Sequence, residues 1–399
     1  MPLKKFRKIT IDMILKREDL VKAYEQKNLK NYTKSLELFE RLYNENPESF
    51  SYRDKVNYAW MIIKVRIENS QDKDEFFRSV EYITNLLPQA NLNVNSSCPY
   101  TASVFKVLIK FKKDKNYIDM IPWLEKLDPE LLDEKPHRSY GRQQKTRKEL
   151  YYFFASKAYL DDFQFERCIE VSQTALDTLA KFNDDSDSWF HWRIAKSLNQ
   201  LNRLQEALPH YLQVIKVKHD WYMYRDIAEI YCILGKPYDA LDYLCPAVLA
   251  KGSYATKMGL YYLCYKVLKT FNMEMALKHA QFYSLLLDEK GYSAPYEIEQ
   301  LNIDAAKFDK NELGMEITRL WTQYKYKDQK RQHGTVIKFL EDKNFGFIRS
   351  DDGKEIFFHR NEFKGYRIFV GQNVSFFTEE NFDKSKNRKS LKAVIVRSE

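Results

Sequence analysis

The sequence predicts a mainly α-helical protein in which a long array of helical repeats precedes a small β-structured domain. Three observations support this fold class. The 399 residues include only 11 Gly and 11 Pro, fewer turn-forming residues than an all-β chain needs. A pattern of small and apolar residues recurs with a period of 33 to 36 residues in the middle of the chain. After residue 332, the helical spacing of apolar residues gives way to alternation.

Length, charge and cysteine content limit the classes of protein to consider. A chain of 399 residues is longer than one hydrophobic core usually organises, so several structural units are expected. A net charge of +9 favours polyanionic partners without requiring them. The five cysteines are scattered without a CxxC pair, which indicates neither a zinc site nor a disulfide framework. With no recognisable leader or membrane-length apolar run, we expect a cytoplasmic protein that does not enter a membrane.

The repeat is clearest over three consecutive units. In the first unit, the small or apolar positions are Ala195, Leu198, Ala207, Tyr211 and Val214. The second unit, 33 residues further on, has Ala228, Tyr231, Ala240, Leu244 and Ala247. The third unit, after a step of 36 residues, has Cys264, Val267, Ala276, Ala280 and Tyr283. Small residues let two antiparallel helices approach closely, and large apolar residues pack against the next pair, so stability accumulates along the array.

This period and pattern resemble the tetratricopeptide repeat, a helix pair that stacks into an α-solenoid. We expect the array to span residues 1–302, with weaker matches around Ala23 and Ser156, and a capping or linker helix to span 303–332. The resemblance implies a concave surface that holds a protein or peptide partner.

A basic stretch at residues 137–148 leaves two interpretations open. It contains no acidic residue, and its cations are Arg138, Arg142, Lys145, Arg147 and Lys148. Short charge runs are most often solvated surface, which is the interpretation that we favour. The alternative is a second patch that contacts nucleic-acid phosphates.

Residues 333–399 form the predicted β domain, and its first aromatic segment is KNFGFI. Side chains alternate along a strand, so Phe345 and Phe347 share one face with Lys343 and Arg349, whereas Ile348 faces the core. An exposed pair of rings with cations beside it fits a nucleic acid, because bases stack on the rings and phosphates attract the cations.

A second segment, EIFFH, repeats this arrangement. Ile356 and Phe358 point inward, and Phe357 and His359 point outward. Base stacking on such rings contributes roughly 1–3 kcal/mol per base. His359 alone would be uninformative, but it lies on the same face as Phe357.

These two segments closely resemble the ribonucleoprotein motifs of the cold-shock domain, a five-stranded β-barrel of the oligonucleotide-binding (OB) type. The segments 334–336, 371–376 and 393–394 agree with that family's first, fourth and fifth strands. The resemblance implies binding of single-stranded RNA or DNA, most readily RNA. The predicted contacts are Lys338, Lys343, Phe345, Phe347, Arg349, Phe357, His359, Arg360 and Tyr366.

Three positions depart from the family pattern, and a fourth supplies a loop aromatic. Lys338 replaces the first-strand tryptophan, and Arg360 replaces the aromatic residue after the second-motif histidine. Asn344 replaces a glycine, which it can do because Asn tolerates left-handed backbone geometry. Tyr366 is expected to replace a loop aromatic. Fewer rings and more cations predict weaker and more salt-sensitive binding than in a typical family member.

No catalytic frame is recognisable in the chain. It has no GxxxxGK[ST], HExxH or GxSxG motif, and its seven histidines do not form an acid–base constellation. We therefore predict no enzyme activity, no catalytic residue, no metal and no cofactor.

The hypothesis from sequence is an adaptor that tethers a protein partner, held by the repeats, to single-stranded nucleic acid. One alternative is a protein-interaction scaffold with a degenerate barrel, in which Phe345, Phe347 and Phe357 are covered by the helical array. The other is a regulatory subunit or nuclease that acts on bound RNA.

Overall fold

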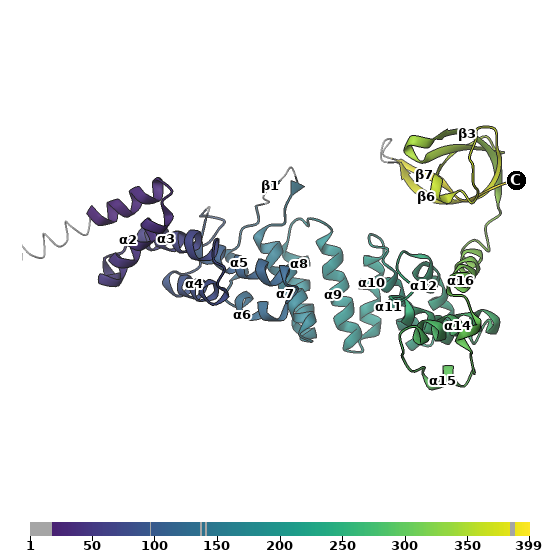
Figure 1. Ribbon diagram of the computed structural model, residues 1–399, viewed down its shortest axis with the longest axis horizontal. Coiled ribbons are helices and arrows are strands. Elements are labelled where there is room, and N and C mark those ends of the chain that lie inside the picture. The colour runs from purple at the N-terminus through teal and green to yellow at the C-terminus, as the bar shows by residue number, and fades with distance from the viewer. Residues whose placement is uncertain (1–17, 96, 136–137, 140–141, 384–387) are drawn as a thin grey trace, which may run out of the picture. The chain divides into compact units, whose positions relative to one another are not determined.

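The computed structural model describes residues 18–95, 97–135, 138–139, 142–383 and 388–399. Figure 1 shows the elements of the chain, coloured by residue number. The chain divides into two compact units, Met1–His219 and Asp220–Glu399. This division lies inside the array predicted for residues 1–302, whose boundaries stay predictions. Within the described residues, no helix is long and apolar enough to cross a membrane.

The described part of the first unit consists of helices, joined by turns and longer loops, and a pair of short strands. Residues 18–28 are helical. The following helices are α2 (Tyr32–Glu45), α3 (Tyr52–Ile62), α4 (Lys73–Leu86), α5 (Pro99–Lys113), α6 (Ile121–Leu124), α7 (Arg147–Asp161), α8 (Phe165–Thr178), α9 (Ser186–Gln200) and α10 (Leu204–Val214). A π-helical turn, η2 (Ile63–Ile67), continues α3, and the strands β1 (Arg138–Ser139) and β2 (Arg142–Gln143) pair before α7.

Small residues lie where these helices meet, as the repeat pattern predicts. In the first unit, α7 packs on α8, α8 on α9, and α9 on α10. Ala155, Cys168, Ala195 and Ala207 are fully buried at these contacts. The Cys168 thiol also donates a hydrogen bond to the Ser156 carbonyl oxygen of α7 at 3.2 Å. A larger side chain at these positions would push the paired helices apart.

The second unit continues with helix pairs and adds a terminal helix. Its helices are α11 (Trp221–Ile233), α12 (Pro237–Leu249), α13 (Met258–Leu268), α14 (Met273–Asp288), α15 (Tyr296–Glu299) and α16 (Lys310–Lys325). Gly235 adopts φ +71° in the turn between α11 and α12, a conformation that favours glycine. Helix α16 packs on α12 and α14 through Trp321, whose indole N–H donates to His279 Nε2 at 2.8 Å. Both side chains are fully buried.

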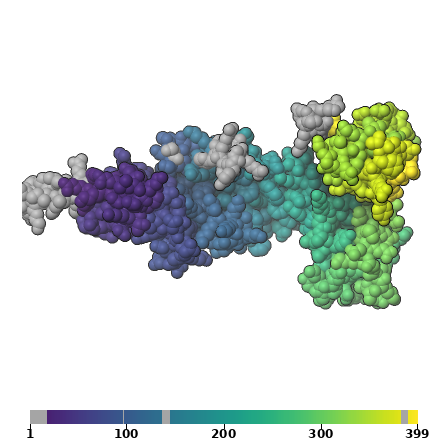
Figure 2. Space-filling view, turned by 45° about the horizontal axis from the view of Figure 1, so that its top comes forward, coloured from purple at the N-terminus to yellow at the C-terminus, as the bar shows by residue number. Residues whose placement is uncertain are grey.

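A closed barrel follows α16 and confirms the predicted small β-barrel fold. Among its described residues, five strands pair in the order β3-β4-β5-β7-β6. The strands are β3 (Gln332–Leu340), β4 (Phe345–Ser350), β5 (Glu355–His359), β6 (Asn373–Asp383) and β7 (Arg388–Ser398). Ile348, Ile356 and Phe358 are buried in its core, as predicted from alternation. The space-filling view shows the barrel as a rounded body in yellow-green (Figure 2).

The predicted α-solenoid with a small C-terminal five-stranded barrel is thus the observed fold class. The array is tetratricopeptide-like in the sense that antiparallel helix pairs bury a small residue on each helix at the predicted spacing. The barrel buries one side chain in two along β4 and β5, which leaves the other side chains of these strands on the outer face.

Candidate nucleic-acid interface

Three phenylalanine rings lie together on the outer face of β4 and β5. The ring centroids of Phe345 and Phe347 are 5.9 Å apart, those of Phe345 and Phe357 are 5.5 Å apart, and those of Phe347 and Phe357 are 6.0 Å apart. Each ring is partly exposed, and in the described part of the chain their ring contacts are with each other. We call these three residues the aromatic face.

The register of the sheet arranges the predicted contacts in rows across the strands. Phe347 pairs with Lys338 of β3 on one side and with Phe357 of β5 on the other. Phe345 pairs with His359 of β5. Residues that pair directly across a sheet project from the same face, so the rings and these polar groups converge on one surface.

Two residues give β4 its position. Asn344 adopts φ +56°, in the left-handed region, and so turns the chain into β4 as the sequence predicts. Gly346 faces inward, where an added Cβ would lie 2.5 Å from the Lys338 carbonyl oxygen and 2.7 Å from the Phe358 ring. The Phe-Gly-Phe sequence therefore lets β3 and the core approach β4 closely between two outward rings.

A β-bulge brings Lys338 onto the outer face. Val336 points into the core, and a residue two positions later would normally do the same. The register shifts between Val336 and Lys338, because Ile337 is an extra residue on β3. The shift turns Lys338 outward, opposite Phe347. Sequence reasoning placed Lys338 here by family resemblance and missed the bulge.

His359 and Arg360 hold the chain that follows β5. The Nδ1 atom of His359 accepts a hydrogen bond from the Asn361 N–H at 3.3 Å, so in the neutral ring Nε2 carries the proton. The Arg360 guanidinium donates to the carbonyl oxygens of Gly365 at 3.4 Å and Tyr366 at 3.1 Å. Arg360 therefore braces the loop that carries the fully exposed Tyr366. Its contact with nucleic acid stays a prediction.

Lys343 and Arg349, at the edge of the aromatic face, are exposed, and the described ion pair of Arg349 is weak. Lys343 is exposed. The Arg349 guanidinium lies 3.2 Å from a Glu355 carboxylate oxygen, and both side chains are more than half exposed. Exposed ion pairs of this kind contribute only about 0–1 kcal/mol, so a phosphate can replace the carboxylate at little cost.

One cation of the face was missed by sequence reasoning. Phe357 pairs in parallel with Lys392 of β7, and the neighbouring residues Phe358 and Ala393 are both fully buried. Lys392 therefore projects outward beside Phe357. The alternation of Lys392 and Ala393 was the signal in the sequence, but the parallel pairing that brings β7 beside β5 is not visible there.

The basic stretch near α7 does not form a comparable surface. The Lys148 ammonium contacts Glu134 at 3.0 Å and Glu130 at 3.2 Å, and the Arg147 guanidinium contacts Asp133 at 2.9 Å. Lys145 is only 13% exposed as a side chain, and burial lowers its pKa. The side chains of Arg138 and Arg142 lie outside the described part of the structure. The alternative of a second phosphate patch gains no support from the cations that are described. The favoured interpretation of solvated surface is wrong for Lys145 and Lys148, whose side chains are mostly buried and paired with carboxylates.

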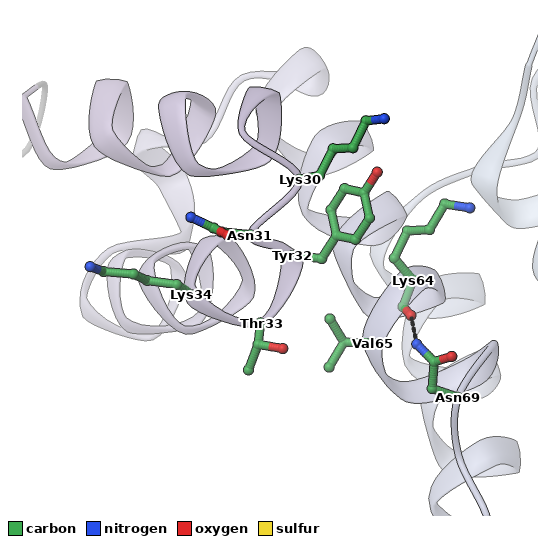
Figure 3. A pocket seen from close by; sticks show the side chains of 8 residues that line it. All are labelled: Lys30, Asn31, Tyr32, Thr33, Lys34, Lys64, Val65 and Asn69. Carbon is green, nitrogen blue, oxygen red and sulfur yellow. Dashed lines mark hydrogen bonds between the residues drawn. The ribbon is translucent and has the colours of Figure 1, made fainter.

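A basic hollow of about 520 Å³ lies at the start of α2 (Figure 3). Lys30 and Tyr32 lie beside Lys64 in this view, and the Asn69 amide donates to the Lys64 carbonyl oxygen at 2.8 Å. The Lys64 ammonium is paired with Glu68 at 2.9 Å. Among the eight described residues that line the hollow, none is His, Cys, Asp or Glu, so the lining offers no imidazole, thiol or carboxylate group.

An open groove of about 610 Å³ is formed by α4, α5, α6 and the turns beside them. Its floor is aromatic, because the Phe77 ring lies 5.6 Å from Phe111 and 5.8 Å from Trp123, measured between centroids. The charged residues at the groove are Lys73, Glu81, Asp119 and Asp162. The groove thus combines apolar rings with a net negative rim.

Among the described residues, no cluster of three or more His, Cys, Asp or Glu side chains has a geometry that could hold a metal ion. The interface on the barrel consists of rings, ammonium and guanidinium groups, and one imidazole, which suits binding of a polyanion with exposed bases.

A closed five-stranded barrel with rings and cations on one sheet face defines a nucleic-acid-binding module of the OB type. Residues 332–396 match the family model described as the 'Cold-shock' DNA-binding domain. This part of the chain is therefore a cold-shock domain, as its two motifs predict. No curated protein matches the chain as a relative.

Several solved structures match the chain at low similarity. The Cut9–Hcn1 hetero-tetramer of APC/C is 9% identical with a TM-score of 0.35, and the match covers 64% of this chain but only 43% of that chain. The apo form of RapI is 14% identical with a TM-score of 0.41, covering 79% and 88%. A tetratricopeptide repeat protein from Parabacteroides merdae is 12% identical with a TM-score of 0.31, covering 77% and 98%. Because these TM-scores are low, the tetratricopeptide-like character of the array follows from its own helix pairs alone.

Proposed function

We propose that this protein is a cytoplasmic adaptor that tethers a protein partner, held by the helical array, to single-stranded RNA bound on the barrel. The observation that carries the proposal is the aromatic face, three partly exposed rings on the adjacent strands β4 and β5. In the row across the sheet, Lys338 lies beside Phe347 at one end and Lys392 lies beside Phe357 at the other. Exposed rings in contact with water are unfavourable unless a partner covers them, and nucleobases do so by stacking.

In the proposed mode of binding, successive bases stack on Phe345, Phe347 and Phe357. Lys338, Lys343 and Arg349 lie near enough to the rings to attract the phosphates between those bases. His359 offers its Nε2–H as a donor to a base or to a 2′-hydroxyl group, which is where RNA differs from DNA. The tether needs no metal, no cofactor and no catalytic step, so we propose that the protein is not an enzyme.

The scaffold alternative is less well supported. It requires the three rings to be covered by helices, whereas in the described structure they are partly exposed and touch each other. No observation on the described residues favours a nuclease over a binding protein.

The groove of α4, α5 and α6 supports the partner half of the proposal. Its aromatic floor fits an apolar side chain, and its negative rim complements a cation beside that side chain. We therefore propose a partner segment in which an apolar residue neighbours Lys or Arg.

The nucleic-acid half is tested by fluorescence anisotropy with labelled single-stranded RNA and DNA of matched sequence, at two salt concentrations. The double variant Phe345→Ala, Phe357→Ala should lose at least about tenfold in affinity, because each stacked base contributes roughly 1–3 kcal/mol. The control is Tyr296→Ala, which removes an exposed ring away from the barrel. Equal binding by all three proteins would place the nucleic acid elsewhere.

The partner half is tested with a photo-crosslinking amino acid at Ile118, on the groove, and at Val217 as a control of similar exposure in the same unit. The proposal expects one adduct from position 118 that is lost when Glu81 and Asp119 are changed to Lys. An adduct that forms equally from position 217, or that survives the charge reversal, would contradict the groove as the docking site.

A further inference from the structure

Glu379 of β6 holds three groups at the edge of the barrel. Its Oε2 atom lies 3.0 Å from the Lys392 ammonium. Its Oε1 atom accepts a hydrogen bond from the Tyr326 hydroxyl at 2.5 Å and also contacts the Lys325 ammonium. Burial alone would raise the pKa of Glu379, but hydrogen bonds from Lys325, Tyr326 and Lys392 lower it to about 2. The carboxylate is therefore ionised at neutral pH.

Two of these groups come from the chain that enters the barrel. Lys325 is the last residue of α16, and Tyr326 follows it. The Tyr326 ring stacks on Phe377 of β6, with centroids 4.6 Å apart and planes 9° from parallel. The Arg331 guanidinium lies over the Phe377 ring, 4.8 Å from its centroid, and donates to Ser375 Oγ at 3.0 Å. Glu379 thus belongs to the junction between α16 and β3.

The third group belongs to the aromatic face. Lys392 pairs directly with Glu379 of β6 on one side and with Phe357 of β5 on the other. Its side chain is one-third exposed. The Lys392 ammonium, which contacts the Glu379 carboxylate, therefore also lies beside the Phe357 ring, on which a base is proposed to stack.

We propose that Lys392 is a phosphate-contacting residue of the nucleic-acid interface and that Glu379 competes with the phosphate for its ammonium. This inference rests on the proposed binding of nucleic acid to the aromatic face. It adds a residue that the cold-shock motifs do not include, and it identifies a carboxylate that lowers the affinity of the interface.

The geometry makes the exchange inexpensive. A buried carboxylate that loses its only partner is strongly destabilising. Glu379 keeps Lys325 and Tyr326 when Lys392 turns to a phosphate, so it remains paired. When Lys392 binds a phosphate, two donors share the Glu379 carboxylate instead of three. The remaining contacts of Glu379, with Lys325 and Tyr326, then both belong to the junction.

The same contacts link binding to the junction. If nucleic acid draws Lys392 away from Glu379, it strengthens the hold of Glu379 on Lys325 and Tyr326. Linkage is reciprocal, so a change that weakens that hold while leaving the Glu379 carboxylate in place must weaken nucleic-acid binding. The variant Tyr326→Phe, which removes only the hydroxyl, should leave Glu379 more dependent on Lys392 and lower the affinity.

The test is a double-mutant cycle on a labelled single-stranded RNA, measured by anisotropy at constant salt. Glu379→Gln should raise the affinity about two- to fivefold, the range expected for releasing a partly exposed ion pair. Lys392→Gln should lower the affinity, and Lys392→Arg should retain it. In the Lys392→Gln background, Glu379→Gln should have little effect.

The matched control is Glu380→Gln, which makes the same change in charge at the next residue. Glu380 is 3.9 Å from Lys389 and pairs across the sheet with Leu391. If Glu380→Gln raises the affinity as much as Glu379→Gln, or if the effects at 379 and 392 are additive, the inference is overturned while the proposed function stands. If the wild type binds neither RNA nor DNA, both are overturned. Melting temperatures of all variants show whether each remains folded.

Discussion

The basic residues around α7 and those on the barrel are alike in sequence but differ in their surroundings. Near α7, Lys148 lies between two carboxylates and is almost fully buried, and Lys145 lies over the Phe153 ring. On the barrel, Lys343 is exposed, and Arg349 has one exposed partner. A cation that is already paired inside a fold stabilises it, whereas one on an open face beside rings is available to a ligand. The two regions differ in whether their cations are free to bind a ligand, more than in how many cations each stretch of sequence contains.

The largest effect that would test this contrast is on stability. Glu149 is fully buried and accepts hydrogen bonds from Asn183 N–H at 2.8 Å and from the Ser186 hydroxyl at 2.6 Å. Glu149→Ala should lower the free energy of unfolding of the first unit by about 3–5 kcal/mol, because it removes the buried carboxylate that accepts from Asn183 and Ser186 and neutralises Lys145, 3.8 Å away. Urea unfolding followed by circular dichroism measures the change. Where the protein still folds, its RNA affinity should be unchanged.

Acid should destabilise the second unit's helices through His279. Burial lowers the pKa of His279 to about 4, and the ordinary value is 6.5. Unfolding lets the ring take up a proton, so the stability from this group is fully present above pH 6.5 and is lost as the pH falls toward 4. The loss approaches about 3 kcal/mol at the acid end. Thermal unfolding between pH 7 and 4 measures it, and His279→Gln should flatten the dependence. A profile unchanged by that variant would contradict the assignment.

Removing one ring should weaken binding without unfolding the barrel. Phe357→Ala should reduce RNA affinity by about 5- to 150-fold, equivalent to one stacked base. Phe357 is only partly buried, so the melting temperature should change little. Isothermal titration measures the affinity. A loss of affinity together with a large loss of stability would show that the ring is structural.

Removing the charge of Lys343, at the edge of the aromatic face, should change the salt dependence of nucleic-acid binding. Lys343→Gln should make the slope of log K against log salt concentration shallower by about 0.7, the value for one phosphate of a single strand. Anisotropy between 50 and 300 mM salt, roughly the range in which such slopes are linear, measures it. An unchanged slope would remove Lys343 from the phosphate path.

The smallest effect on RNA affinity should come from changing a basic residue of the helical array. Arg147→Gln removes a cation that is paired with Asp133. If the contrast between the regions holds, RNA affinity should change less than about twofold, because only long-range charge is altered. A loss as large as that of Lys343→Gln would mean that the basic stretch binds phosphate after all, despite its internal partners.

Much of the fold could be predicted from local patterns. The spacing of Ala195, Ala228 and Cys264 indicated the helix pairs, and alternation placed Ile348 and Phe358 in the barrel core. Both signals arise because burial repeats with the period of the element, 3.6 residues in a helix and two in a strand.

The interface was predicted less completely, because part of it depends on non-local pairing. The bulge that turns Lys338 outward depends on how β3 meets β4, and Lys392 joins the face only because β7 lies beside β5. Likewise, Glu130 and Glu134 are separated from Lys148 by a turn and a hairpin, so the pairing of that lysine is invisible in its own basic stretch. Alternation and helical spacing say which way a side chain points, but not which element lies opposite.

The pairing order of the barrel also bears on how fast the interface appears during folding. Helices α9 and α10 are neighbours in sequence, whereas β3 must meet β6 through Gln332 and Phe376, and β5 must meet β7 through Phe357 and Lys392. Contacts between distant residues form more slowly than local ones. The helix pairs should therefore be complete while the barrel is still open. During that interval the chain can already offer the proposed partner groove but has no assembled surface for the proposed nucleic-acid ligand. The order of folding would then also set the order in which the two proposed ligands can be bound.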